Sequence, residues 1–413
     1  MFNSNLSEMK KIKLLMMVAM AMVLAGTFTS CKKDEKIVEV EKIVEKEVPV
    51  EKVVEKEVIK EVEVDNAYSR YLKAIVENVK AEKKNNKVIL LVAFGSTWEQ
   101  AFDAFDDTVD AYKEVFPDYD VFLSYSSAIC INRAAGGENT DPRNFYAPSF
   151  WLSAFANKDI QYSEIVIQSL QVIPGEEYTR VINYIKDFAN NANGDLDDEY
   201  LAGVTLKLGV PLLQDKDTDV PNVAAELHKL YGSKATTDIV AFMGHGNPDS
   251  FDTYKANVRY TELEQALQEM SPNYFVGTVD MMENFKTHVY DRMEKAGLNT
   301  SDLKVWLHPL MSINGDHGHN DMAGDDLPED VDPENYTFAQ LQAMANEEGE
   351  VEDTSWKMYF GAPGSGFKCD DSTVIPLGLL ELPTVRQIWM DHTQDAIDGE
   401  PLDFYHSMYP EEG

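Results

Sequence analysis

Cysteine and positive charge are both scarce in this chain. Three cysteines occur in 413 residues. Cys31 lies near the N-terminus, which leaves Cys130 and Cys369 in the globular part. Nothing in the sequence shows that these two meet, and the apolar run SAICI around Cys130 is equally typical of a buried free thiol. Basic residues number 36 against 72 acidic ones. Because phosphate binding needs a basic surface, this balance argues against nucleic acid as a partner.

Long apolar runs are also missing, apart from one segment near the N-terminus. Three lysines precede an apolar run at 14–26, which is too short to span a bilayer as a mature helix. Small and polar residues then lead into TFTSC, an order typical of a secretory signal peptide. TFTSC resembles a bacterial lipoprotein box with Cys31 as the lipidated residue. We therefore expect a signal peptide at 1–30 and an exported protein anchored to a membrane through Cys31. It would lie in the periplasm or, given the KKDE that follows, on the outer-membrane surface.

Residues 31–66 are of low complexity. EKIVEKEVPV (41–50) is followed by EKVVEKEVIK (51–60), a repeat of Glu, Lys and Val. The repeat length fits neither a heptad nor a helical stripe, and Pro49 would interrupt a long helix. We interpret the segment as a stalk, with a short coiled coil as the alternative.

From residue 67 onward, apolar strand patterns alternate with amphipathic helical patterns. The predicted strands in the first half are KVILLVAFGST, YDVFLSYSS, SEIVIQSLQVI and VTLKLGVPLL, and the series restarts with DIVAFMGHGN, YFVGTVD and LKVWLHPLMSI. Such alternation predicts an α/β fold with parallel sheets, and the restart predicts two similar lobes. We place the lobes at 67–217 and 218–405, followed by a tail at 406–413.

Polar residues follow the strands in both halves. They are Ser96, Ser126 and Ser169 in the first half and His245, Asp280 and His317 in the second. Because the carboxyl ends of adjacent parallel strands meet at one crevice, the second half should gather two imidazoles and a carboxylate. The first half should face them with hydroxyl groups and the amide of Gln168.

The second-half residues are of metal-ligand type. The glycines of MGHGN allow a sharp turn that exposes His245, and Asp316, Asn320 and Asp321 can orient His317. Each residue alone also has a structural interpretation: His245 satisfied by backbone groups, or Asp280 as a helix N-cap. We expect His319 to face solvent. Together, two histidines and a carboxylate suit a divalent transition metal, which predicts a metal-dependent enzyme without choosing between hydrolysis and metal transfer.

Several motifs resemble those of a known family. They are ILLVAFGST, IQSLQVIPGEEY, LGVPLL, VAFMGHG, GTVD, HPLMSINGDHGHNDMAGDD and SWKMYF, in this order between Lys87 and Ile397. The chain resembles the anaerobic cobaltochelatases of the CbiK type, class II chelatases that insert cobalt into sirohydrochlorin. The resemblance implies two Rossmann-like lobes with a tetrapyrrole-binding cleft between them.

The resemblance also implies a site. His245, Asp280 and His317 would bind the metal, with Asp280 standing where the family has Glu and Glu283 nearby as a substitute. His245 and His317 would in addition act as catalytic proton acceptors. Co²⁺, or alternatively Fe²⁺ or Ni²⁺, would be the substrate metal, with no organic cofactor.

The opposite wall of the cleft would hold the tetrapyrrole. The expected residues are Ser96, Thr97, Ser126, Ser127, Arg133, Gln168, Ser169 and Lys357. Gln171 stands where relatives often have His, and the insertion at 327–354 would form either a flap over the cleft or a disordered loop. A homo-oligomer is compatible with the sequence. The expected export leaves an alternative function open, a haem- or tetrapyrrole-binding or metal-removing lipoprotein without biosynthetic turnover.

Overall fold

The computed structural model describes residues 38–39, 60–61, 67–300 and 302–402. The chain divides into two units, 1–75 and 76–413. In the first, strand β1 (Val38–Glu39) pairs antiparallel with β2 (Lys60–Glu61) within the predicted stalk. The predicted signal peptide, Cys31 and the tail at 406–413 lie outside the described residues. Helix α2 (Ala67–Glu82) crosses the division.

The second unit contains two parallel sheets of four strands each. The first has the order β4-β3-β5-β6, and the second has the order β10-β9-β7-β8. The strands of the first are β3 (Lys87–Ala93), β4 (Asp120–Tyr125), β5 (Glu164–Ser169) and β6 (Thr205–Gly209). Those of the second are β7 (Ile239–Gly244), β8 (Tyr274–Thr278), β9 (Leu303–Pro309) and β10 (Phe367–Lys368). The predicted α/β fold with two parallel sheets is confirmed; β10, only two residues long, was not predicted.

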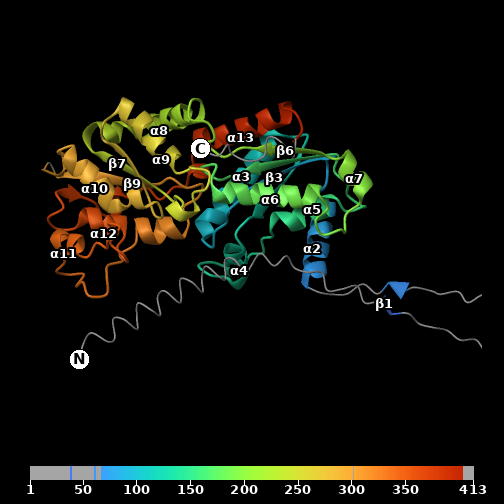
Figure 1. The fold of residues 1–413 in the computed structure, drawn as a ribbon, viewed down its shortest axis with the longest axis horizontal. Helices are drawn as coiled ribbons and strands as arrows, with labels where there is room; N and C mark the ends of the chain where they lie inside the picture. Colours follow the sequence, from blue (N-terminus) through green and yellow to red (C-terminus); the bar gives the residue numbers. More distant parts are fainter. Residues whose placement is uncertain (1–37, 40–59, 62–66, 301, 403–413) are drawn as a thin grey trace, which may run out of the picture. The chain divides into compact units, whose positions relative to one another are not determined.

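Helices cover both faces of each sheet (Figure 1). In the first lobe they are α3 (Glu99–Val115), α4 (Ala128–Gly136), α5 (Pro148–Phe155), α6 (Glu176–Ala189) and α7 (Asp198–Gly203). Next come α8 (Asp219–Thr237), α9 (Val258–Met270), α10 (Lys286–Lys295), α11 (Phe338–Ala343), α12 (Trp356–Gly361) and α13 (Pro383–Asp398).

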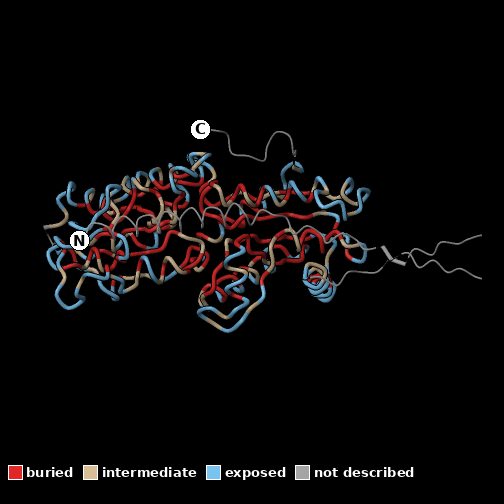
Figure 2. Tube along the Cα trace, turned by 60° about the horizontal axis from the view of Figure 1, so that its bottom comes forward, coloured by how far each residue is buried: buried red, intermediate tan, exposed pale blue. Residues whose placement is uncertain are grey.

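The side chains of β7 point alternately to its two faces, and the two faces belong to different hydrophobic cores. Val240 and Phe242 pack with residues of α8 and α9, whereas Ile239, Ala241 and Met243 pack with residues of α10, α11 and α12. Since successive side chains of a strand point to opposite faces, an uninterrupted apolar run is what a strand covered by helices on both sides requires. Figure 2 shows the resulting buried strands.

The last helix returns to the first lobe. Although α13 lies in the sequence range assigned to the second lobe, it packs against β5 and β6. Trp389 is fully buried and its Nε1 donates to the carbonyl of Gln171 at 3.3 Å, while Thr393 Oγ1 donates to Gln168 Oε1 at 2.8 Å. One apolar cluster therefore continues from the first sheet through α13 and α8 to the second sheet.

The insertion at 327–354 packs onto the second lobe. Phe338, Leu341 and Val351 are buried in the core that contains α10 and α12, and the Phe338 ring lies 4.3 Å from that of Tyr290. No residue of the insertion lines the cavity described below. The expectation of a flap or a disordered loop is therefore wrong, because these apolar side chains anchor the segment in the core.

Two further points concern the cysteines and whether any helix could cross a membrane. Cys130 and Cys369 are both free thiols, and burial raises the pKa of each. Among the described residues, no helix combines the length and the apolar character needed to cross a bilayer.

Candidate functional site

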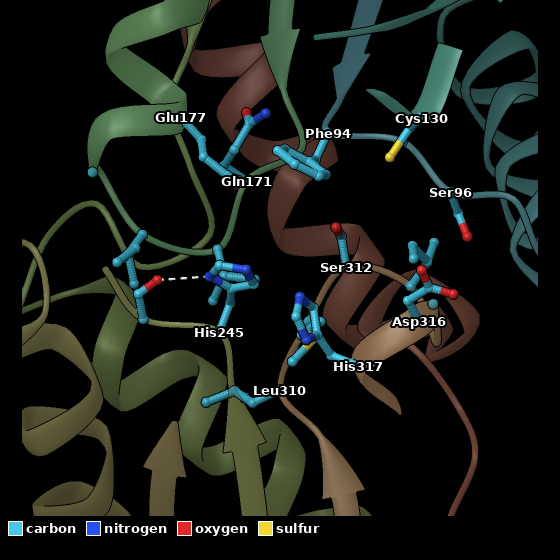
Figure 3. A pocket seen from close by; sticks show the side chains of 18 of the residues that line it. Phe94, Ser96, Cys130, Gln171, Glu177, His245, Leu310, Ser312, Asp316 and His317 are labelled. Carbon is cyan, nitrogen blue, oxygen red and sulfur yellow. Dashed lines mark hydrogen bonds between the residues drawn. The ribbon is translucent and has the colours of Figure 1, made fainter. Parts of the chain in front are cut away.

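A cavity lies where the carboxyl ends of the two sheets face each other (Figure 3). The first lobe contributes the turn after β3 (94–97), Cys130 of α4, the segment between β5 and α6 (171–175) and Glu177 of α6. The second lobe contributes the turn after β7 (245–247) and the loop after β9 (310–317). This is the crevice that the parallel topology predicted.

His245 is exposed at the end of β7 by two glycines. A Cβ atom on Gly244 would lie 2.4 Å from the Tyr260 ring, and Gly246 has φ +77°, which favours glycine. The His245 Nδ1 lies 2.7 Å from the carbonyl oxygen of Gly246. Because a carbonyl oxygen can only accept, Nδ1 carries the proton of the neutral ring, which leaves the Nε2 lone pair available for a metal or a proton.

His317 stands at the start of a π-helical turn, Gly318–Met322. Such turns are frequent at functional sites. The His317 Nδ1 lies 2.6 Å from Asp321 Oδ2, so its Nε2 is likewise left available. Burial lowers the pKa of His317, but the hydrogen bond to Asp321 and the charges of Asp321, Asp280 and Asp316 outweigh burial and raise it.

The two imidazoles meet in the cavity. Their ring centroids are 4.7 Å apart with the planes nearly perpendicular, and each side chain is about two-fifths exposed (37% and 39%). Both rings line the cavity. The predicted approach of His245 and His317 is therefore present, although they are far apart in the chain.

Glu177 lies across the cavity from the histidines (Figure 3) and was missed by the sequence reasoning. It belongs to the first turn of α6. Burial is the main cause that raises the pKa of Glu177, and the charge of Asp280 adds to it; positive charge on His245, Arg180 and His317 acts the other way. The available signal was an acid placed directly after a strand and a Pro-Gly turn.

Residues 87–332 match the profile of the family described as cobalt chelatase (CbiK), which is more than half of the chain. The chain belongs to this family. A sirohydrochlorin cobaltochelatase, CbiKC, of Nitratidesulfovibrio vulgaris is 28% identical over 76% of this chain and 91% of its own length. The sirohydrochlorin cobaltochelatase of Salmonella typhimurium is 25% identical over 76% of this chain and 97% of its own length. Among solved structures, SirB from Bacillus subtilis with Fe³⁺ has 13% identity and a TM-score of 0.44, covering 77% of this chain and 99% of that one. The predicted family and enzyme class, a chelatase, are confirmed.

Asp280 of this chelatase does not lie beside the two histidines in the cavity as the prediction places it. Its Oδ2 is 3.6 Å from His245 Nδ1, the nitrogen that Gly246 already engages, and Asp280 does not line the cavity. In the part of the chain that the structure describes, no three His, Cys, Asp or Glu side chains are placed to hold one metal ion. Of the three predicted metal ligands, His245 and His317 lie together in the cavity and Asp280 lies outside it.

Of the predicted tetrapyrrole-binding residues, Ser96 and Thr97 line the cavity. Ser126 and Ser127 are buried and do not line it, and Ser127 instead caps α4 by accepting from the Cys130 N–H at 3.3 Å. Ser127 thus supports the start of α4, whereas the buried Ser126 hydroxyl has no hydrogen-bond partner among the described residues.

Gln168 and Ser169 are buried and do not line the cavity. The Gln168 amide donates to the carbonyls of Ser169 and Val210, and Ser169 Oγ donates to Gln171 Oε1. Gln171 lines the cavity in their place. Gln168 and Ser169 end β5, and their side chains hydrogen-bond to polar groups inside the first lobe.

The two predicted cations differ in position. Lys357 is buried, with Nζ 2.8 Å from Asp325 Oδ1 and 2.6 Å from Asp371 Oδ1, and does not line the cavity. Arg133 is half exposed, with Nη1 3.7 Å from Asp316 Oδ2. Only Arg133 therefore lies near the cavity, beside one of its lining residues.

Proposed function

We propose that this protein inserts Co²⁺ into a sirohydrochlorin-like tetrapyrrole bound in the cavity between the lobes. The observation that carries the proposal is the pair of imidazoles at 4.7 Å, each with Nδ1 engaged and Nε2 available, facing the carboxyl group of Glu177. The similarity to the sirohydrochlorin cobaltochelatases of Nitratidesulfovibrio vulgaris and Salmonella typhimurium supports the reaction.

The histidines suit a metal that must be held and then released. A neutral imidazole nitrogen binds divalent first-row metals without adding negative charge. In the proposal, His245 and His317 bind the incoming Co²⁺ through Nε2 and pass it to the macrocycle. Asp280, next to the Nδ1 side of His245, offsets the charge that the metal places on the ring.

Protons must leave as the metal enters. A free tetrapyrrole carries two pyrrole N–H protons, and both are lost when the metal takes their place. A base works best when its pKa is close to the working pH, so a carboxyl group with a raised pKa is suited to accept them. We assign this role to Glu177; once Co²⁺ has passed to the macrocycle, the freed Nε2 of a neutral histidine accepts the second proton.

The experiment mixes purified protein, sirohydrochlorin and Co²⁺, and follows the visible absorption of the metallated product over several turnovers. We expect His245→Ala to abolish turnover. His228→Ala is the matched control, because His228 pairs with the Tyr274 hydroxyl and does not line the cavity. A coloured complex that forms once and releases no product would support the alternative of a binding protein instead.

The choice of metal is a separate part of the proposal. Two imidazoles accept Co²⁺, Fe²⁺ and Ni²⁺. Rates measured with each metal under the same conditions would rank them, and Co²⁺ is expected to give the highest kcat/KM.

We also propose that the protein is exported and lipid-anchored. The support is the basic, apolar and small-residue order of 1–30, with TFTSC ending at Cys31. Labelling cells with an alkyne fatty acid should tag the wild type and not Cys31→Ser. An untagged wild type in the cytosolic fraction would rule this out. The homo-oligomer stays a prediction.

A further inference from the structure

The loop that carries His317 is contacted by side chains of the other lobe. Trp98, directly before α3 in the first lobe, stacks on His319 with ring centroids 3.8 Å apart and planes at 14°. Its Nε1 donates to Asp316 Oδ1 at 2.6 Å. His319 therefore lies against the indole rather than facing solvent freely, and one tryptophan contacts the loop on both sides of His317.

A second set of contacts holds the same loop. Asn314 Nδ2 lies 3.3 Å from Gln100 Oε1 of α3 and 3.3 Å from His319 Nε2. Gln100 Nε2 donates in turn to Glu381 Oε1 at 3.0 Å. Two neighbouring side chains of the first lobe, Trp98 and Gln100, thus attach to a loop of the second lobe.

The loop needs such support. Gly315 and Gly318 flank the Asp316-His317 pair, and glycine leaves the backbone more freedom than other residues do. Among the described residues, the His317 ring hydrogen-bonds only to Asp321, whose Oδ2 accepts from Nδ1 and which belongs to the same π-helical turn. The distance between His317 and His245 therefore depends on contacts from outside the turn.

We propose that Trp98 is a positioning residue that holds the His317 loop, through Asp316 and His319, where His317 and His245 can bind one Co²⁺ together. The proposal rests on the proposed function for the role of the two histidines. Trp98 itself does not line the cavity. Its removal should consequently weaken Co²⁺ binding and raise the KM for Co²⁺, while the KM for the tetrapyrrole stays unchanged.

The test measures Co²⁺ affinity by calorimetry, with the metal alone, in the full-length protein. Trp98→Phe keeps an aromatic ring for the stack and removes the N–H donor; Trp98→Ala removes both. A hydrogen bond to a charged acceptor is worth enough that Trp98→Phe should bind Co²⁺ about tenfold more weakly, with a larger loss for Trp98→Ala.

Trp306→Phe is the matched control. Trp306 is also partly buried, and its Nε1 also donates to a carboxylate, Asp238 Oδ2, at 3.2 Å. Asp238 precedes β7 and so lies at the end of the sheet away from the cavity. This variant should bind Co²⁺ like the wild type.

A double-mutant cycle separates positioning from general destabilisation. If Trp98 acts through His317, Trp98→Ala should have no further effect on Co²⁺ affinity in a His317→Ala background. Co²⁺ affinity in either Trp98 variant equal to that of Trp306→Phe would overturn the proposal, as would an undiminished effect in the His317→Ala background. Because these outcomes are read from metal binding alone, they are distinct from a failure of the wild type to metallate a tetrapyrrole. Trp98→Phe keeps the test decisive should Trp98→Ala fail to fold.

Discussion

Replacing Glu177 by Gln should lower turnover and at the same time stabilise the protein at neutral pH. The amide has nearly the same shape as the carboxyl group but cannot accept a pyrrole proton. General-base catalysis typically contributes about 10²–10⁴-fold, so we expect kcat to fall by at least about 10²-fold. Co²⁺ affinity should change much less, since the two imidazoles remain.

The effect on stability follows from the direction of the pKa shift. Burial raises the pKa of Glu177 in the folded state, so ionising this group opposes folding. The wild type therefore loses stability relative to Glu177→Gln as the pH rises from the ordinary carboxyl pKa through the raised one. Below the ordinary carboxyl pKa, Glu177 is protonated in both the folded and unfolded states, and its titration no longer separates the two proteins.

The assay combines metallation rates with denaturant unfolding at several pH values. Glu176→Gln is the matched control, because Glu176 is the adjacent acid of the same helical turn, accepts from the Thr253 N–H at 3.3 Å and does not line the cavity. Full turnover in Glu177→Gln would refute the assignment of Glu177 as base. A stability difference that shrinks with rising pH would refute the burial argument.

Three further predictions concern the surroundings of the two histidines and the joined core. Asp321→Asn removes a charge that raises the pKa of His317, so the acid limit of Co²⁺ binding should move to lower pH, as titrations across pH would show; an unchanged limit would count against Asp321 as the cause. Gly246→Ala places a side chain at φ +77°, 3.1 Å from the Met281 backbone. The left-handed backbone alone should lower the free energy of unfolding by roughly 1–2 kcal/mol, and the close contact should lower it further. Gly297→Ala has a similar φ of +75° in open space, so equal losses of unfolding free energy in the two variants would exclude a contribution from the contact. Trp389→Ala empties a fully buried site in α13 and should cost roughly 3–5 kcal/mol in chemical denaturation; a loss below 1 kcal/mol would mean that α13 does not join the lobes energetically.

Local patterns were sufficient for the framework of the fold and for part of the site. The uninterrupted apolar runs of β3 and β7 predicted parallel strands, because only strands covered on both faces exclude polar residues throughout. The positions of His245 and His317 beyond the ends of two strands predicted their approach, because parallel strands bring their carboxyl ends to one edge. These features can be read from single strands and the segments that follow them.

The remaining assignments depended on which groups each side chain contacts, and the sequence alone does not show this. Gln168 lies near the end of β5 and Gln171 just after it, but Thr393 of α13 donates to the first, and the second lines the cavity. Lys357 looked free to bind a carboxylate of the substrate, yet Asp325 and Asp371 already surround its ammonium group. In each case the partner comes from a distant part of the chain.

By itself, the sequence determined the α/β class, the two-lobed organisation, the two histidines of the site and the resemblance to the chelatase family, since each of these follows from local patterns of strands, turns and motifs. Only the tertiary structure decided that Glu177 faces the histidines, that Asp280 stands on the Nδ1 side of His245, and that Trp98 reaches Asp316 across the lobes. The physical reason is that hydrogen bonds and charge interactions act over a few ångströms in space, and which side chains come that close is settled by the packing of whole lobes.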